Sequence, residues 1–200
     1  RAHRPREKDG APDFYRQPAF TPWPDREIAL DASAAGMAEA EGISRAEQEA
    51  FAAESHRRAL AVPAAEGEIV PVAGLAADAF ARRLSPALMA RLPVLAGDAA
   101  HGVTAATIAV EADAAGLVLL GPAQAGDVTM AGGLARGGDP LVPALAPIAA
   151  VEALCTRLGI APGAIDHVEL MEAYAAQALV ALRRLGLDPG MAGRIHEHRF

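Results

Sequence analysis

The amino-acid sequence predicts an α/β fold, and three observations carry that prediction. The last third of the chain alternates helix, strand and helix, over 147–158, 165–170 and 172–185. A capping box formed by Ser44 and Glu47 marks the start of an earlier helix. Short apolar runs bounded by glycine or proline lie between these parts, as buried strands do. Helices alternating with strands are typical of a layered α/β domain.

The composition is that of a folded domain with a fine-grained core. The 200 residues are 52% apolar and 22% charged, and they include 50 alanines but one Trp, two Tyr and five Phe. We therefore expect helices that pack closely on small side chains. The net charge of −7 argues against a nucleic-acid partner, because attraction to phosphate requires the opposite sign. No apolar run is long enough for a membrane span.

The sequence of the first half of the chain predicts an extended segment followed by two helices. Proline is too frequent in 1–27 for a helix, so we expect an extended strap, with a loose terminus as the alternative for its first twelve residues. The first ten residues lack an apolar core, so we expect no signal peptide and a cytoplasmic location. Residues 28–41 have a helical pattern interrupted at Gly36, and the capping-box helix runs over 44–60. A short edge strand is expected over 68–72.

The middle of the chain is a series of short elements. A glycine-flanked loop occupies 97–102, and apolar runs follow at 107–110, 116–120 and 127–130. The first of these runs fits a helix as well as a strand, because short apolar runs do not distinguish the two. Pro147 at the first turn and Gly159 after the last one delimit the next helix.

Few residues suggest chemistry by themselves. Cys155 is the single cysteine, which excludes an intrachain disulfide, and its place on an apolar helical stripe predicts a buried hydrophobe, not a nucleophile. His196 and His198 have the spacing of a ligand pair but lie beside the chain end, where a solvated tail is the simpler interpretation. His101, inside the glycine-flanked loop, is a candidate for ligand contact or an exposed loop residue. His56 is expected on the flank of its helix.

Several segments resemble the thiolase family, whose members join or cleave 3-ketoacyl-CoA. The similar segments are GISRAEQEAFAAESHRRA at 42–59, EIVPV at 68–72, GDAAHGVT at 97–104, the GDP…AP pattern at 138–147, and the strand and MEAYAAQ helix of 165–189. The resemblance runs over about residues 14–190. It implies an α/β fold that is thiolase-like and partial.

The resemblance also implies a division of the chain. Residues 1–96 would form the strap and a mostly helical loop domain, and 97–200 an incomplete C-terminal βαβ half. Because such a half is short of strands, we expect an exposed sheet edge and exposed apolar faces. We therefore expect a homo-oligomer, or a hetero-oligomer with a thiolase-like or accessory chain.

The catalytic groups of the family are not matched. Its nucleophilic cysteine, its GHPxG histidine and its second cysteine have no counterpart here. The asparagine that holds the oxyanion-hole water falls at Met171, whose thioether cannot donate a hydrogen bond, although the neighbouring Glu172 is retained. We expect no catalytic residue and no metal site in this chain.

The loop that faces coenzyme A (CoA) in the family is altered as well. The pantetheine-facing serine falls at Ala100 or His101, and the family's Asn-Asp pair at Thr104 and Ala105. Ala100, His101 and Thr104 are therefore the expected contact positions for a CoA or acyl-CoA ligand, in degenerate form. No resident cofactor is expected.

Three functions are compatible with these observations. The first is a thiolase-family acyltransferase chain whose catalytic groups lie outside this sequence. The second is a non-catalytic subunit that binds acyl-CoA or stabilises a partner, and the third is a structural module without a CoA site. Met171 counts against the first because it lies within the sequence. We expect the second, with the third as the alternative, and a chain that is inactive by itself.

Overall fold

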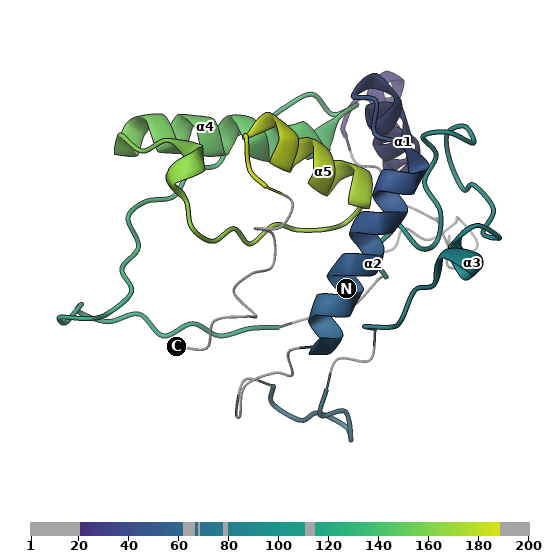
Figure 1. Ribbon diagram of the computed structural model, residues 1–200. Helices are drawn as coiled ribbons and strands as arrows, with labels where there is room; N and C mark the ends of the chain where they lie inside the picture. Colours follow the sequence, from purple (N-terminus) through teal and green to yellow (C-terminus); the bar gives the residue numbers. More distant parts are fainter. Residues whose placement is uncertain (1–20, 62–66, 68, 78–79, 111–114, 189–200) are drawn as a thin grey trace, which may run out of the picture.

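The helices surround one central helix. The computed structural model describes residues 21–61, 67, 69–77, 80–110 and 115–188. They contain α1 (Leu30–Ala40), α2 (Arg45–Ala61), α3 (Pro86–Met89), α4 (Ala146–Leu158) and α5 (Ala175–Arg184), with 3-10 turns at Pro24–Arg26, Pro143–Leu145 and Pro162–Ala164. Figure 1 shows α5 between α4 and α1, with α2 beside it, and α5 contacts all three.

Several helix ends form as the sequence predicts. The carboxylate of Glu47 accepts from the Ser44 amide at 2.8 Å, and the Glu47 amide donates to Ser44 Oγ at 3.2 Å. This pair satisfies two amides that the start of α2 would otherwise leave without partners. Gly159 ends α4 in the left-handed region, with φ of 68°, which glycine adopts without steric cost.

Two helix predictions were wrong in detail. α1 runs through Gly36 without interruption, because one glycine costs a helix only about 1 kcal/mol and most of its neighbours here are alanines. α5 begins at Ala175 and not at 172, because the preceding backbone pairs elsewhere. The Ala109 amide donates to the Ala173 carbonyl and the Ala175 amide to the Thr107 carbonyl, both at 2.9 Å.

The core is built largely from small side chains, as the composition predicts. One cluster lies between α1, α4 and α5 and comprises Met37, Ala38, Ile43, Ile148, Ala176, Val180 and Ala181. A second joins Ala34, Ala35 and Val103, and a third joins Leu182 and Leu187. Cys155 is a free thiol with 4% of its surface exposed, so its predicted burial is confirmed.

Extended strands are missing from the described part of the chain. Pairing there is confined to single bridges, which join Val72 with Leu75, Ala96 with Val103 and Ile108 with Tyr174, and Val168 carries one more. The runs 116–120 and 127–130 and the segment 165–170 form no ladder, contrary to prediction. A strand requires neighbouring backbone for its hydrogen bonds, and no described segment lies alongside these runs in a ladder.

Some predictions fall beyond the described residues or stay untested. The greater part of the strap, residue 68 of the edge strand, and both His196 and His198 lie outside the described residues. The domain boundary near residue 96 stays a prediction, and the core clusters draw side chains from both sides of it. None of the described helices is long and apolar enough to cross a membrane.

Candidate functional site

The glycine-flanked loop closes on itself through an aspartate. Asp98 Oδ1 accepts from the amides of Ala100 and His101 at 3.0 and 2.7 Å. The Gly102 amide donates to the Asp98 carbonyl at 2.9 Å, so the turn is closed from both directions. A Cβ on Gly102 would lie 2.3 Å from that carbonyl oxygen, which shows that the turn requires glycine here.

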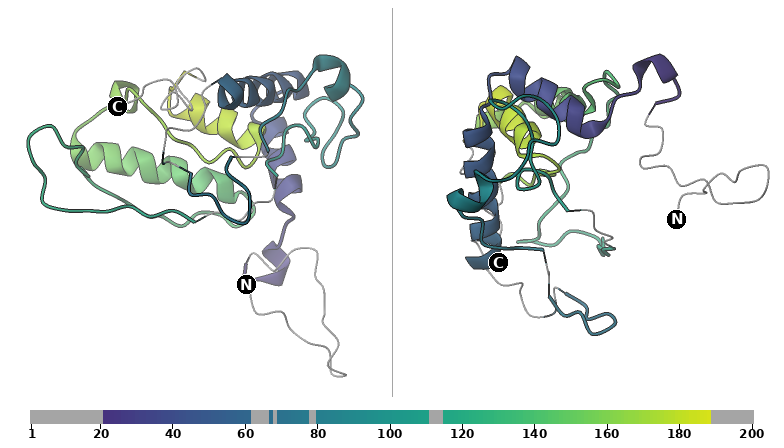
Figure 2. Two further views of the ribbon diagram at one scale, coloured as in Figure 1. Left: turned by 90° about the horizontal axis from the view of Figure 1, so that it is seen from below. Right: turned by 90° about the vertical axis from the view of Figure 1, so that its right-hand side faces the viewer.

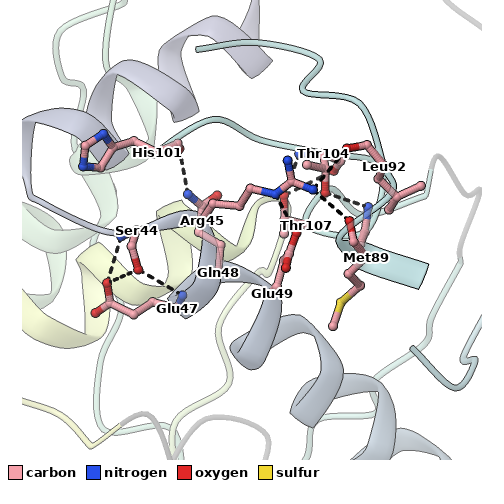
Figure 3. A network of polar contacts seen from close by, with 11 residues as sticks. Ser44, Arg45, Glu47, Gln48, Glu49, Met89, Leu92, His101, Thr104 and Thr107 are labelled. Atoms are coloured by element: carbon pink, nitrogen blue, oxygen red, sulfur yellow. Dashed lines mark hydrogen bonds and ion pairs between the residues drawn. The ribbon is translucent and has the colours of Figure 1, made fainter. Parts of the chain in front are cut away.

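The loop is fastened to the first turns of α2 (Figure 3). The Arg45 amide, at the helix start, donates to the Ala100 carbonyl at 2.6 Å. One turn later the Gln48 side-chain amide, which is fully buried, donates to the His101 carbonyl at 2.8 Å. The carbonyls of Ala100 and His101 therefore bond α2 and point into the protein.

Arg45 holds a second connection on the same side of α2. Its guanidinium donates to the carbonyls of Met89 and Leu92 at 2.8 and 3.1 Å, and to the carboxylate of Glu49 at 2.7 Å. Arg45 and Gln48 thus explain part of the GISRxxQ pattern as a scaffold. This role was not predicted from the sequence, although the i, i+3 and i+4 spacing of Arg45, Gln48 and Glu49 places their side chains on one helical face.

The three expected CoA-contact residues differ in accessibility. Ala100 is exposed, and the His101 side chain is 30% exposed with Nδ1 3.4 Å from Asp98 Oδ1. Thr104 is fully buried, and its amide and carbonyl both bond Thr107, the amide through Thr107 Oγ1 at 2.9 Å. A ligand at the loop surface would therefore contact Ala100 and His101 but not the Thr104 side chain.

Asp98 gives the loop surface a negative charge. The hydrogen bond from the His101 amide, followed by that from Ala100, lowers the pKa of the Asp98 carboxyl below its ordinary value. The carboxylate side chain is 57% exposed. The amides of Ala100 and His101 donate to this carboxylate and not to an anionic ligand.

The side chains of the neighbours Met171 and Glu172 lie in different surroundings, one in solvent and the other against α2. Met171 is 79% exposed, whereas Glu172 is half-buried and accepts a hydrogen bond from Ser55 Oγ at 2.5 Å. Glu172 lines a groove of about 250 Å³. Its other walls include Phe51, Ser55, His56, Phe80, Ile108 and Val110. His56 thus lies on the flank of α2, as predicted, where Nδ1 accepts from the Arg82 amide at 3.4 Å.

The predicted site residues therefore form two groups along α2. The loop meets the helix at Arg45 and Gln48, whereas Glu172 meets it at Ser55. Seven residues of helix separate Gln48 from Ser55, which is about 10 Å at 1.5 Å per residue. The sequence contains no local signal for the Ser55–Glu172 contact, because the partners are 117 positions apart.

Comparisons with known sequences point to one family, although no family model matches the chain. The β-ketoadipyl-CoA thiolase of Pseudomonas putida is 37% identical over 167 residues, which cover 72% of this chain and 41% of that protein. The 3-ketoacyl-CoA thiolase of Serratia proteamaculans is 33% identical over 202 aligned positions, covering 88% and 52%. This chain spans about half the length of the curated relatives it matches.

Solved structures agree in fold. Human mitochondrial 3-ketoacyl-CoA thiolase superposes with a TM-score of 0.68 at 23% identity, over 83% of this chain and 46% of that one. The Acat5 thiolase of Ascaris suum, in complex with coenzyme A, also gives 0.68, at 25% identity over 84% and 48%. The dimeric peroxisomal thiolase of Saccharomyces cerevisiae gives 0.62 at 20% identity, over 82% and 46%. The fold is thus thiolase-like and partial, and the chain belongs to the thiolase family.

Proposed function

We propose that this chain is a non-catalytic thiolase-family subunit that binds acyl-CoA without transferring the acyl group by itself. The observation that carries the proposal is the burial of Cys155, the only thiol in the sequence, on the inner face of α4. A thiol that attacks an acyl-CoA must be accessible to it, and burial removes that access. Met171, exposed and without a donor, adds nothing to an oxyanion hole.

The loop on α2 supports the binding half of the proposal. Its shape is held by Gly97 and Gly102 and by the bonds to Arg45 and Gln48, so Ala100 and His101 are presented on a rigid support. His101 and the more exposed Asp98 are the polar side chains of this loop that a pantetheine amide could reach. The complex of the Ascaris suum thiolase with coenzyme A is consistent with a CoA-binding role for this fold.

A structural module without a CoA site is the second candidate, and two observations favour it. Thr104, which falls at a polar loop position of the family, is fully buried. Asp98 places a carboxylate on the loop surface, and the chain carries a net charge of −7, so both repel an anionic ligand such as CoA.

The proposal includes association and location. We expect a homo-oligomer, or a hetero-oligomer with a thiolase-like or accessory chain, in the cytoplasm. The division into a helical part up to residue 96 and a C-terminal part from 97 belongs to the same proposal.

Calorimetric titration with CoA and acetyl-CoA distinguishes the two candidates. We expect binding tighter than about 1 mM, weakened at least about fivefold in His101→Ala and unchanged in His167→Ala, a histidine on another exposed segment. Binding of millimolar affinity or weaker in the unmodified chain would establish the structural module instead.

A thiolysis assay with acetoacetyl-CoA tests the catalytic half separately. The chain and its Met171→Asn variant should both show no turnover above the uncatalysed rate, because a hydrogen-bond donor cannot replace a nucleophile. Turnover by either protein would refute the non-catalytic assignment.

A further inference from the structure

The two ring nitrogens of His101 lie in different environments. Nδ1 is buried, and within the described residues it has no hydrogen-bond partner. The carboxylate of Asp98 faces it, with Oδ1 at 3.4 Å, which is longer than an ordinary hydrogen bond. The side chain is 30% exposed, and Nε2 belongs to the accessible part of the ring. One nitrogen therefore faces a charge inside the loop, and the other faces solvent.

The loop itself fixes the Asp98 carboxylate in this position. Its Oδ1 accepts from the amides of Ala100 and His101 at 3.0 and 2.7 Å. The bond from the His101 amide, followed by that from Ala100, lowers the pKa of Asp98, so the carboxylate stays charged at neutral pH. The carboxylate cannot turn away from the imidazole without losing these two hydrogen bonds. The contact between Asp98 and the imidazole is therefore a stable part of the turn.

The charged side chains at the start of α2 are engaged elsewhere. Arg45 bonds Glu49 and two backbone carbonyls. Glu47 bonds the serine that caps the helix. In Figure 3 the His101 ring and the Arg45 guanidinium point in opposite directions. Asp98 is therefore the charge that determines which ring nitrogen of His101 carries the hydrogen.

This charge favours one of the two neutral forms of the imidazole. With a lone pair on Nδ1, that lone pair would face the carboxylate and be repelled by it, and a buried acceptor would lack a donor. With the hydrogen on Nδ1, the N–H group points toward Asp98 Oδ1, and the interaction is attractive. In this second form, Nε2 is a hydrogen-bond acceptor at the loop surface.

We infer that Asp98 is a positioning residue for ligand binding, which holds the hydrogen of His101 on Nδ1 so that Nε2 accepts a hydrogen bond from an amide N–H of a pantetheine arm. This inference rests on the proposed CoA-binding role. It gives Asp98 a favourable part in binding, whereas charge repulsion by itself would only weaken the binding of an anionic ligand. A ligand group that offers only acceptors, such as an ester, is disfavoured at this nitrogen.

The position of the hydrogen is measured first, on the chain without ligand. Proton–nitrogen correlation spectra of the isotope-labelled protein, in alkaline solution where imidazole is neutral, distinguish the two forms, and His101→Ala assigns the signals. We expect the hydrogen on Nδ1 in the unmodified chain and a shift toward Nε2 in Asp98→Asn. The asparagine oxygen can still accept from the two loop amides, but it carries no charge. A hydrogen on Nε2 in the unmodified chain, or the same form in both proteins, would overturn the inference.

Binding is then measured with pantetheine, which lacks the phosphates of CoA, so that its affinity does not depend on net charge. Pantetheine should displace the Nε2 signal of the unmodified chain. Asp98→Asn should weaken its affinity about three- to tenfold, the value of one hydrogen bond. Unchanged or tighter binding of pantetheine by Asp98→Asn would show that Asp98 acts only as a charge, and would overturn the inference.

Asp127→Asn is the matched control. Asp127 Oδ2 accepts from the Gln124 amide at 2.7 Å in an exposed turn without a histidine. Figures 1 and 2 show the segment that carries this turn well away from α3 and the loop that follows it. The control removes the same charge and should leave both the His101 spectrum and the affinity for pantetheine unchanged. An equal loss of affinity in this variant would contradict a specific role of Asp98.

Failure of this inference is distinguishable from failure of the proposed function. Calorimetric binding of CoA by a chain whose hydrogen lies on Nε2 would refute the role of Asp98 alone. The hydrogen on Nδ1 in a chain that binds neither CoA nor pantetheine would refute the CoA-binding function, and with it the ligand contact inferred for Nε2.

Discussion

The side-chain amide of Gln48 donates to the carbonyl oxygen of His101 across 2.8 Å, although the two residues are 53 positions apart. Through this bond, helix α2 and the loop at 97–103 become one rigid unit. The unit explains why Gln48 is fully buried in an otherwise polar helix. The geometry of the loop therefore depends on its hydrogen bonds to α2.

Gly102→Ala should deform the loop. The new Cβ would lie 2.3 Å from the Asp98 carbonyl and 2.6 Å from Val94 Cγ1, so the free energy of unfolding should fall by about 1–3 kcal/mol. Urea denaturation measures this change. Gly133→Ala is the control, because its Cβ would meet nothing within 4 Å, and it should stay within about 0.5 kcal/mol of the unmodified chain. Equal effects of the two changes would argue against a tight loop.

Arg45→Met should destabilise more than Arg57→Met on the same helix. Arg45 is 19% exposed and bonds two backbone carbonyls and Glu49, so its loss should cost about 2 kcal/mol. Arg57 is 61% exposed and pairs with Glu54, so its loss should cost about 0.5 kcal/mol or less. Thermal and urea unfolding of both variants measure the difference, and the reverse order would contradict the scaffold role.

Gly36→Ala should stabilise the protein. Gly36 is exposed inside the continuous helix α1, and a Cβ there meets nothing within 4 Å. Replacing glycine by alanine in a helix interior adds about 0.5–1 kcal/mol by reducing the freedom of the unfolded chain. A higher melting temperature is expected, whereas a lower one would indicate that α1 bends at this position.

The stability at acid pH should depend on Glu54. Hydrogen bonds from Arg57 and then Arg58 lower the pKa of this carboxyl from 4.5 to about 2. Because the folded pKa is the lower one, the stabilising contribution is complete above about pH 4.5 and is lost as the pH falls toward 2. Glu54→Gln should therefore flatten the stability profile in that window. Glu152→Gln, at an exposed position on α4, is the control and should leave the profile as it is.

The thiol of Cys155 should be unreactive in the folded chain. It is 4% exposed, so modification by a thiol reagent requires unfolding and should accelerate at least about a hundredfold in denaturant. Thr156→Cys adds an exposed thiol beside it and should react at once. Rapid reaction of Cys155 itself would reopen the possibility of a nucleophile in this chain.

Local signals in the sequence predicted the helices well. Ser44 and Glu47 marked the start of α2, and Pro147 and Gly159 the ends of α4, because capping depends on residues three or four positions apart. The strand predictions were wrong because a strand depends on a distant partner and not on near neighbours. An apolar run such as 116–120 predicts a strand only if a second segment pairs with it, and nothing local in the sequence reports that partner.

The candidate site also has features that the sequence predicts and features that it does not. The sequence shows that position 171 is a methionine, which cannot donate a hydrogen bond, and that position 100 is an alanine. The apolar helical stripe around Cys155 also predicts that the single thiol is not accessible. The burial of Thr104 and the hydrogen bond between Ser55 and Glu172 cannot be predicted from the sequence, because each depends on segments that folding brings together.

By itself, the sequence determined the family, the small-residue core and the helix ends that caps mark at Ser44 and Gly159, since residue identity, composition and capping are properties of single positions and near neighbours. The tertiary structure decided which loop carbonyls α2 holds, which polar side chains turn inward, and that Leu117–Leu120 remain exposed on both faces. These are long-range outcomes, determined by which surfaces find partners and which do not.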